Sequence, residues 1–416
     1  MQKFIPYKWE VIIWLWLVHF FNQADRQIFN VLLPLIKVDM QLSDIQLGFI
    51  ASTFTLCVGL CIPLAGFIGD LYNRKSIIII SVVVWSAATI FTGTSTLLWH
   101  LIMFRCVGVG GGEAFYAPSA NAFISENHVK SRALAISLHQ TALYVGIILS
   151  GIIGGIIGEQ YGWRYAFFIF GIIGILLGVT MFFRLRPSLN IPPASSYPER
   201  KAFIRQAFLL LFKTPSAMLL GGAFICLVYV NVGFLTWMPT YMHEELGQSV
   251  TNAGFSSMFY HHAFAFMGIL SGGVFSDRMA LKSKNARLII QSFSLLLGAP
   301  FIYWMTGSSN VLITYGCLAG FGFFRGMYEA NFVTTLFEVI EPKFHSSIIG
   351  IVYLFVFSIA AISPLVLGYF KESFGLTKGL SFMSIAYVIG SFSVFIALTN
   401  FINKDREKIL QKTTFS

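Results

Sequence analysis

Long apolar segments, one after another, constrain this chain more than any other feature of its sequence. A membrane-spanning helix needs about 20 apolar residues, and the sequence supplies twelve segments of that kind. Their approximate limits are 11–36, 45–69, 76–95, 99–123, 132–157, 163–185, 215–242, 254–276, 286–306, 310–337, 346–370 and 378–402. Because 56% of the 416 residues are hydrophobic and only 11% are charged, we predict an all-α membrane protein with twelve transmembrane helices.

The positions of the basic residues predict how these helices are oriented. Of the 28 Lys and Arg residues, 21 lie on one set of alternating loops and termini, and three lie inside the apolar segments. The other set of loops holds only four, namely Lys37, Arg164, Lys371 and Lys378. Loops rich in Lys and Arg face the cytoplasm, so we expect both termini to be cytoplasmic, in a bacterial inner membrane. This distribution explains the net charge of +10 without a nucleic-acid partner.

A proline-rich and basic stretch divides the twelve segments into six and six. We predict an N-terminal six-helix bundle over residues 1–186, a cytoplasmic linker over 187–213, a C-terminal six-helix bundle over 214–403 and a cytoplasmic tail over 404–416. Within the linker, residues 200–213 have the composition of an amphipathic helix lying on the membrane surface.

An acid and a base stand side by side in the middle of the first segment, at Asp25 and Arg26. Insertion scales put the cost of each such charge at about 2.5–3.5 kcal/mol at mid-bilayer, so these residues usually mark a pathway through the protein interior. Neighbours in a helix point about 100° apart and do not face one another. Asp25 and Arg26 therefore need other partners, and the fourth segment offers Arg105 and Glu113.

The two halves of the chain repeat a pattern, which indicates a duplicated six-helix unit. A glycine and an aspartate four residues apart end the second segment and again the eighth, and basic residues follow in each loop. The residues concerned are Gly66, Asp70, Arg74 and Lys75 in the first half, and Gly273, Asp277 and Arg278 in the second. The fourth and tenth segments each carry an arginine and a glutamate, as Arg105 with Glu113 and Arg325 with Glu329.

The repeated glycine–aspartate motif resembles the signature of the major facilitator superfamily, and the resemblance runs from the first segment to the twelfth. It implies two pseudo-symmetric six-helix bundles that rock around a midplane site. It also implies a gating role for Asp70, Arg74, Lys75, Asp277 and Arg278 on the inner side. This sequence departs from the usual pattern at Leu71, where a base often follows, and at Asn73, where a glycine often stands.

Within the superfamily, the chain resembles the anion:cation symporters and the spinster-like transporters through Asp25–Arg26, Arg105 with the stretch 112–118, and Arg132–Ala133. The resemblance implies that Asp25 and Glu113 couple transport to protons and that Arg26 binds an anionic group. In those families the arginine and the glutamate of the fourth segment are seven residues apart, whereas here they are eight apart. The additional residue predicts a π-bulge or a local unwinding near Gly108–Gly112.

Polar residues in other segments are further candidates for the site. We assign substrate binding to Arg26 and Arg105 and to four other residues, Tyr116, Gln140, Tyr144 and Asn231, and we assign a proton-relay role to His261. Interhelical hydrogen bonds explain the polar residues equally well. Arg105 can be an organising ion-pair partner instead of a ligand, Glu113 can form a permanent salt bridge, and Arg325 with Glu329 can be a purely structural pair.

These observations together predict a secondary active transporter that functions as a monomer. We expect it to move a small organic anion, such as a sugar acid, by proton symport with alternating access. A spinster-like carrier of a lysolipid or other amphipathic molecule is the alternative, and a non-transporting membrane sensor is a remote one. No nucleophile, metal cluster or paired carboxylate of an enzyme stands at a membrane face, and no nucleotide-binding motif or cofactor site is apparent.

Overall fold

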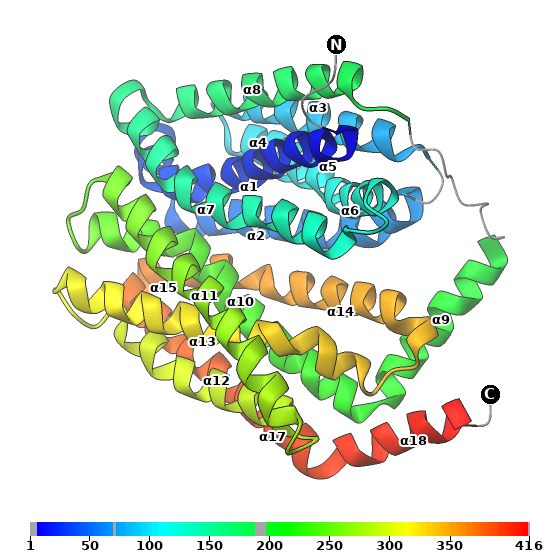
Figure 1. Ribbon diagram of the computed structural model, residues 1–416. Helices are drawn as coiled ribbons and strands as arrows, with labels where there is room; N and C mark the ends of the chain where they lie inside the picture. Colours follow the sequence, from blue (N-terminus) through cyan, green and yellow to red (C-terminus); the bar gives the residue numbers. More distant parts are fainter. Residues whose placement is uncertain (1–5, 70–71, 188–196, 415–416) are drawn as a thin grey trace. The chain divides into compact units, whose positions relative to one another are not determined.

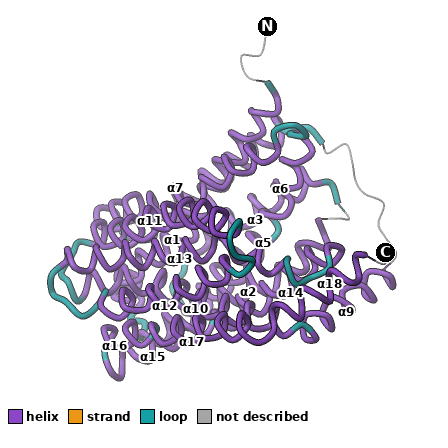
Figure 2. The backbone as a smooth tube through the Cα atoms, turned by 60° about the horizontal axis from the view of Figure 1, so that its bottom comes forward, coloured by secondary structure: helices purple, strands orange, loops and turns teal. Residues whose placement is uncertain are grey.

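A computed structural model describes residues 6–69, 72–187 and 197–414, and these residues form helices joined by short connections, without strands (Figure 2). In the first half these are α1 (Tyr7–Met40), α2 (Asp44–Gly69), α3 (Arg74–Gly93), α4 (Leu98–Leu101), the π-helix η1 (Ile102–Val109), α5 (Gly110–Ala114), α6 (Tyr116–Asn127), α7 (Arg132–Tyr161) and α8 (Trp163–Arg184). In the second half they are α9 (Tyr197–Lys213), α10 (Pro215–Glu244), α11 (Val250–Ala280), α12 (Ala286–Trp304), α13 (Val311–Phe337), the 3-10 helix η2 (Pro342–Phe344), α14 (His345–Ala360), α15 (Ile362–Phe374), α16 (Leu376–Phe382), α17 (Ser384–Ile396), the π-helix η3 (Ala397–Phe401) and α18 (Ile402–Thr414).

Eight helical segments of the described chain are long and apolar enough to cross a membrane. The other four predicted spans correspond to α1, to the run from α4 to α6, to α11 and to α13. Three of the four carry the buried residues Asp25, Arg105 and Glu113 or the buried histidine pair 261–262, and α13 carries the half-buried Arg325 and Glu329. Polar residues lower their mean hydropathy, and the protein interior rather than the lipid accommodates them.

Two breaks interrupt predicted spans near the C-terminus. The span predicted at 346–370 is divided into α14 and α15 at Ala361. Pro364 explains this break, because a proline has no N–H to donate to the carbonyl of residue 360 and its ring crowds that carbonyl. The span predicted at 378–402 consists of α16 and α17 and continues through η3 into α18.

The chain divides into two compact units. Unit 1 comprises Met1–Ala194 and Leu235–Met258, and unit 2 comprises Ser195–Phe234 and Phe259–Ser416. The division into bundles at the linker stays a prediction, and the compact units differ from it where 235–258 join unit 1. Within unit 1, the Glu159 carboxylate accepts hydrogen bonds of 2.6 Å from the Val250 N–H and from the Thr251 hydroxyl. Glu159 thereby caps the N-terminus of α11, where a helix favours negative charge.

Glycines let the helices of unit 1 approach one another closely. α1 and α7 run side by side (Figure 1). A Cβ atom on Gly146 would lie 2.6 Å from the Phe20 carbonyl oxygen, and one on Gly158 would lie 2.2 Å from the Leu32 side chain. Gly151 and Gly155 face the opposite way, toward Gly254 and Thr251 of α11. The glycine series of α7 therefore packs two neighbours closely, and this packing holds the polar part of α1 against α7.

Unit 2 uses the same device between α11 and α13. Cβ atoms on Gly322 and Gly326 would lie 2.0 and 2.1 Å from the carbonyl oxygens of His261 and Ala265, respectively. Only glycine allows so close an approach of two backbones. The contact brings the polar side chains of α11 and α13 within hydrogen-bonding distance.

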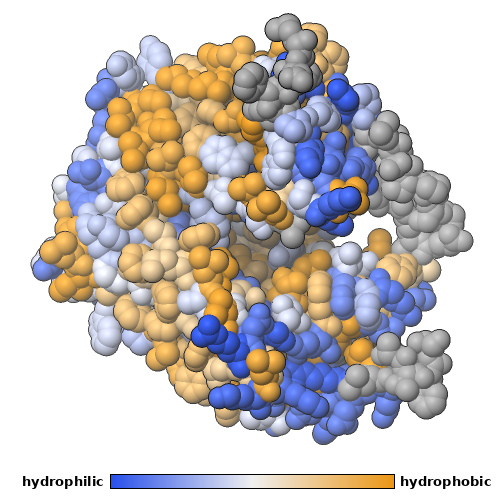
Figure 3. Space-filling model, in the orientation of Figure 1, coloured by the Kyte–Doolittle hydropathy of each residue, from blue (hydrophilic) through white to orange (hydrophobic). Residues whose placement is uncertain are grey.

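The surface has the character expected of a protein surrounded by lipid. Along α8, large apolar residues three or four positions apart are exposed, namely Ile169, Ile172, Leu176, Val179 and Phe183. Hydrophobic residues also cover much of the face seen in Figure 3. In a soluble protein such stripes would be buried, and here they mark the lipid-facing side of the helix.

Candidate functional site

The acid of the first helix is held by two neighbouring helices of unit 1. Asp25 is 3% exposed and accepts a hydrogen bond from the Thr89 hydroxyl of α3. Its other oxygen, Oδ1, lies 4.0 Å from Arg105 Nη1 and has no hydrogen-bond partner among the described residues. Asp25 is therefore a buried carboxyl group held in place by a hydroxyl and by a nearby guanidinium.

Arg105 is enclosed by the protein on every side. It is 2% exposed, and its Nη2 donates a 2.7 Å hydrogen bond to the Arg26 carbonyl oxygen. The guanidinium lies over the rings of Phe54 and Phe29, at 4.5 and 5.3 Å from their centroids. These cation–π contacts and the bond to the α1 backbone give Arg105 the geometry of a positioning residue.

Arg26 differs from Arg105 because its guanidinium donates no hydrogen bond within the described part of the chain. The group is half-buried and lies 5.2 Å from the centroid of the Phe54 ring. Its electrostatic neighbours are Glu113, of opposite charge, and Arg105, of like charge. A planar cation with unused donors matches a carboxylate in two parallel hydrogen bonds.

The predicted helix irregularity between Arg105 and Glu113 is confirmed. Residues 102–109 form the π-helix η1, and the α-helix resumes at Gly110 as α5. A π-turn accommodates one additional residue, so the eight-residue spacing does not rotate Glu113 away from α1. Glu113 is 7% exposed, and its Oε1 has no hydrogen-bond partner among the described residues. Glu113 is thus a buried carboxylate beside Arg26 with an acceptor to spare.

Three polar candidates of α6 and α7 lie in different surroundings. Tyr116 is 1% exposed, and its hydroxyl contacts the Leu15 carbonyl and His139. Gln140 is exposed and Tyr144 half-buried. Their assignment to substrate binding stays a prediction.

Sequence reasoning did not single out His19 as a candidate. This residue of α1 is 5% exposed, and its ring stacks on that of His139 at a centroid distance of 4.5 Å. Its position seven residues before Arg26 is the sequence signal that could have found it, because residues i and i+7 share a helix face.

In unit 2, Arg325 is fully engaged by its neighbours. Its Nε and Nη2 donate to Glu329 Oε1 at 3.0 and 2.8 Å, and its Nη1 lies 2.9 Å from His261 Nε2. Arginine can only donate, so His261 Nε2 accepts and the ring is neutral in this arrangement. A proton-relay role for His261 stays a prediction, and it would require the bond to Arg325 to break. Asn231, on α10, is half-buried, and its Oδ1 has no hydrogen-bond partner among the residues that the structure describes.

Comparison with known proteins identifies the family. The sequence profile of the Major Facilitator Superfamily matches residues 15–364. The chain belongs to the major facilitator superfamily. Members of the superfamily are multi-pass membrane transporters and not enzymes, as the sequence predicted.

Several relatives of this superfamily member are named as transporters of sugar acids. It is 24% identical over 407 residues to the hexuronate transporter of Bacillus subtilis, covering 94% of this chain and 93% of the relative. It is also 24% identical over 407 residues to a probable galactarate/D-glucarate transporter of the same organism, covering 89% and 87%. Protein spinster of Drosophila melanogaster is 25% identical over 327 residues, or 75% of this chain and 53% of the relative.

Solved structures support the same fold. A bacterial homolog of the human lysosomal transporter Spinster, in an inward-facing and unoccupied conformation, matches with a TM-score of 0.82 at 22% identity. The match covers 97% of this chain and 99% of that one. The nucleoside transporter NupG matches with a TM-score of 0.73 at 11% identity, over 94% and 99% of the two chains. The all-helical major facilitator fold predicted from the sequence is thereby confirmed.

Of the superfamily motif, Arg74 and Lys75 begin α3, and Asp277 and Arg278 lie in the last turn of α11. Asp70 lies outside the described residues. Arg74 forms an ion pair with Glu126 of α6, and Lys75 Nζ donates to the Phe182 carbonyl of α8 at 2.8 Å. In unit 2, Asp277 pairs with Arg287 at 2.8 Å, whereas Arg278 is exposed. A gating role for these residues stays a prediction.

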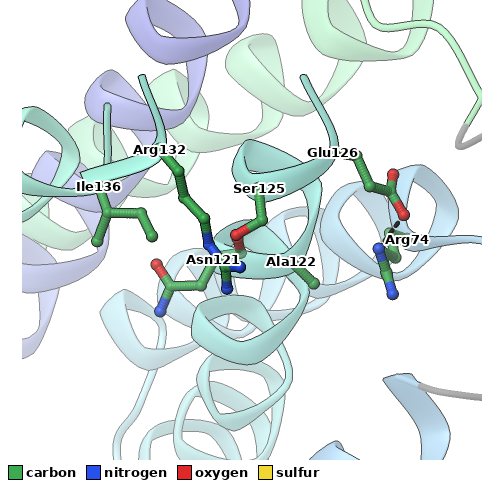
Figure 4. Close-up of a pocket in the computed structure, with 7 residues that line it drawn as sticks. All are labelled: Arg74, Asn121, Ala122, Ser125, Glu126, Arg132 and Ile136. Carbon is green, nitrogen blue, oxygen red and sulfur yellow. Dashed lines mark hydrogen bonds and ion pairs between the residues drawn. The ribbon is translucent and has the colours of Figure 1, made fainter. Parts of the chain in front are cut away.

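A cavity of about 480 Å³ opens beside the Arg74–Glu126 pair (Figure 4). Its lining comes from the start of α3, the end of α6 and the start of α7, and consists of Arg74, Asn121, Ala122, Ser125, Glu126, Arg132 and Ile136. The Arg132 side chain extends toward Asn121 and Ser125. The structure therefore gives Arg132, which the sequence singled out, a place in a cavity whose lining does not include Arg26.

Proposed function

We propose that this transporter moves a small organic anion of the sugar-acid class together with protons, by alternating access. The observation that carries the proposal is the half-buried guanidinium of Arg26, which donates no hydrogen bond among the described residues, whereas Arg105 is bonded through Nη2 to the α1 backbone and keeps Nε and Nη1 unpaired there. Guanidinium donors without an acceptor cost free energy when they leave water, so an incoming carboxylate would complete the hydrogen bonding of this cluster. Arg105 orients this site by holding the α1 backbone at the Arg26 carbonyl.

Glu113 supplies the link to protons. Arg26 is attracted to Glu113 while that carboxylate is charged, and a substrate carboxylate competes for the same guanidinium. Protonation of Glu113 frees Arg26 for the substrate, and release of the substrate returns Arg26 to the deprotonated Glu113. Asp25 is the second proton-coupling group in this scheme. Its neighbours Thr89 and Arg105 stabilise the deprotonated form, so the carboxyl group can release a proton.

The relatives support the chemical class of the substrate. Two of them are a hexuronate transporter and a probable galactarate/D-glucarate transporter, each matched along nearly its whole length. Both names denote six-carbon hydroxy acids with at least one carboxylate. We therefore propose a sugar acid as cargo, an inner-membrane location with cytoplasmic termini, and a functional monomer.

Uptake into proteoliposomes tests the proposal. Purified protein with an imposed inward proton gradient should accumulate a labelled hexuronate, aldonate or aldarate, and a protonophore should abolish the accumulation.

The Arg26→Lys variant tests the role of the guanidinium. It keeps the positive charge but loses the planar group that makes two parallel hydrogen bonds to a carboxylate. Since charged hydrogen bonds contribute about 1.5–3 kcal/mol each, this variant should bind the substrate at least about tenfold more weakly. Wild-type affinity in the folded Lys variant would remove Arg26 from the site.

A second candidate is favoured by an apolar hollow of about 500 Å³ in unit 1. Its lining comes from the end of α2 and the residues after it, from α3, and from η1 and α5 with the residue that follows. The residues are Ile68, Tyr72, Ser76, Ile77, Ile80, Ser81, Val84, Val107, Gly108, Gly111, Gly112 and Phe115. An acyl chain fits such a lining, so an amphipathic lipid is the alternative cargo. A labelled lysophospholipid belongs in the same uptake panel, and its transport in place of the sugar acids would support the alternative.

A further inference from the structure

A second polar cluster lies in unit 1, on the part of α1 that precedes Arg26. It consists of His19 on α1, Tyr116 on α6 and His139 on α7, which are 5%, 1% and 1% exposed. The two imidazole rings stack with centroids 4.5 Å apart and planes inclined by 16°. No carboxylate of the described residues forms a hydrogen bond or an ion pair with these rings, so no acid stabilises a charged imidazole here.

The hydrogen bonds of Tyr116 determine which nitrogen of His139 carries the proton. The tyrosine hydroxyl lies 2.7 Å from the Leu15 carbonyl oxygen and 3.0 Å from His139 Nε2. A carbonyl can only accept, so the single hydroxyl hydrogen of Tyr116 points to Leu15. His139 must then donate from Nε2, and its Nδ1 is left as a bare lone pair. That Nδ1 atom is buried and has no hydrogen-bond partner among the described residues.

His19 and Asn22 add unmet hydrogen-bonding capacity beside this lone pair. Among the described residues, neither ring nitrogen of His19 makes a hydrogen bond of normal geometry, although the Gln140 side chain lies within reach of the ring. A neutral imidazole offers one donor and one acceptor. The amide nitrogen of Asn22, one turn further along α1, is also buried and has no hydrogen-bond partner in the described part of the chain. Buried polar groups of this kind are normally satisfied by protein, water or ligand.

The placement on α1 connects this cluster with Arg26. His19, Asn22 and Arg26 occupy positions i, i+3 and i+7, so they share one face of the helix. Two helical turns separate His19 from Arg26, which corresponds to about 10 Å along the axis. A six-carbon hydroxy acid with one hydrogen bond at each end spans a distance of this order.

We propose that His19 and His139 form a subsite that reads the hydroxyl groups at the uncharged end of the substrate. This inference rests on the proposed function and deepens it. A carboxylate cannot satisfy His139 Nδ1, because an anion has no hydrogen to donate. A hydroxyl group both donates and accepts hydrogen bonds. It can therefore donate to the lone pair of His139 Nδ1, and it can bond either the donor or the acceptor nitrogen of the neutral His19 ring. The rings are closed to solvent in this structure, so a hydroxyl reaches them when the rings rotate.

The experiment compares two ligands that differ in one hydroxyl group. Binding of an aldonate and of its 6-deoxy analogue to the purified transporter is measured by calorimetry, for the wild type, His19→Phe and His139→Phe. Phenylalanine keeps the ring stacking and removes the nitrogens. The wild type should prefer the hydroxylated acid by at least about tenfold. Each variant should bring the ratio of the two dissociation constants near one, by weakening only the hydroxylated ligand.

Two further variants make the result specific. His139→Gln places an amide near Nε2, so it can keep the bond to Tyr116 while losing the Nδ1 acceptor, and it should also lose discrimination. His100→Phe, the same exchange on α4 outside the cluster, should discriminate like the wild type. An unchanged ratio in folded His19 and His139 variants would overturn the subsite while the proposed function stands. Failure of the wild type to bind any sugar acid would instead overturn both.

Discussion

Two arginines of the same helical bundle show how surroundings decide what one residue type does. Arg105 is covered by Phe54 and Phe29 and donates to the backbone of α1, whereas Arg26 keeps its donors unused beside Glu113. A covered guanidinium stabilises the arrangement of its neighbours. A half-buried one that donates no hydrogen bond among the described residues is available to a ligand.

Replacing Arg105 should therefore affect stability more than Arg26→Lys does. Arg105→Lys loses the planar contact with Phe54 and the directed bond to the Arg26 carbonyl. We expect a destabilisation on the order of 1–3 kcal/mol, seen as a lower melting temperature of the purified protein. Arg26→Lys should melt close to the wild type while binding substrate weakly. An Arg105→Lys protein with wild-type melting and weakened binding would instead make Arg105 a ligand.

At the scale of elements, η1 places Glu113. Because the π-turn accommodates one additional residue, removing one residue should leave a regular α-helix in which Glu113 keeps its orientation, whereas adding one more residue should rotate Glu113 by about 100°. Deletion of Gly111 should therefore retain gradient-driven uptake, and insertion of an alanine after Gly111 should abolish it, even where the protein still inserts and purifies as a folded monomer. Gly111→Ala is the matched control, because a Cβ there meets nothing within 4 Å. Loss of uptake by the folded deletion variant, or full uptake by the insertion variant, would contradict this role of the π-turn.

The ends of α1 and α8 are joined by a carboxylate outside the membrane. Asp39 accepts hydrogen bonds from Arg164 and from Trp163 Nε1, the latter at 3.1 Å. The hydrogen bond from Arg164 holds the pKa of Asp39 below its ordinary value of 3.8. A lowered pKa means that the ionised form stabilises the folded state above pH 3.8, and that this contribution disappears as the pH falls through the lowered pKa.

Asp39→Asn should thus lower stability at neutral pH by less than about 1 kcal/mol, since the pair is partly exposed. Melting temperatures of the wild type and the variant, measured between about pH 3 and pH 8, should differ by a constant amount near neutrality and converge in acid. A difference that grows on acidification would contradict this account.

For the whole molecule, the central question is how one proton site drives a cycle. In the proposed scheme, Glu113 must release its proton for the empty carrier to return, whereas exchange of substrate for substrate needs no release. The two activities are therefore separable by one substitution.

Glu113→Gln keeps the shape and hydrogen bonding of the protonated acid but cannot deprotonate. We expect loss of gradient-driven accumulation with retention of counterflow, measured in the same proteoliposomes at fixed pH. Asp25→Asn should give a separable loss if both acids carry protons. Full accumulation by Glu113→Gln would make Glu113 structural, and loss of both activities in a folded protein would favour a permanent salt bridge with an arginine.

Local features of the sequence predicted much of this architecture. The apolar segments, the Asp25–Arg26 pair and the bulge before Glu113 each depend on residues close together in the chain. The role of His19 was not predicted, because its partner His139 is 120 residues away and only the packing of α1 on α7 brings them together. For the same reason, no sequence pattern could show that Arg105 donates to the Arg26 carbonyl rather than facing a ligand.

The π-helix also has a consequence for the gene. One extra codon between those for Arg105 and Glu113 would ordinarily displace every later residue of a helix around its axis. Here η1 absorbs the addition within eight residues, so the segment after it keeps its orientation. An insertion or loss of three nucleotides at this point is thus a short mutational step between related transporters, and a one-residue gap in their alignment marks where the helix bulges.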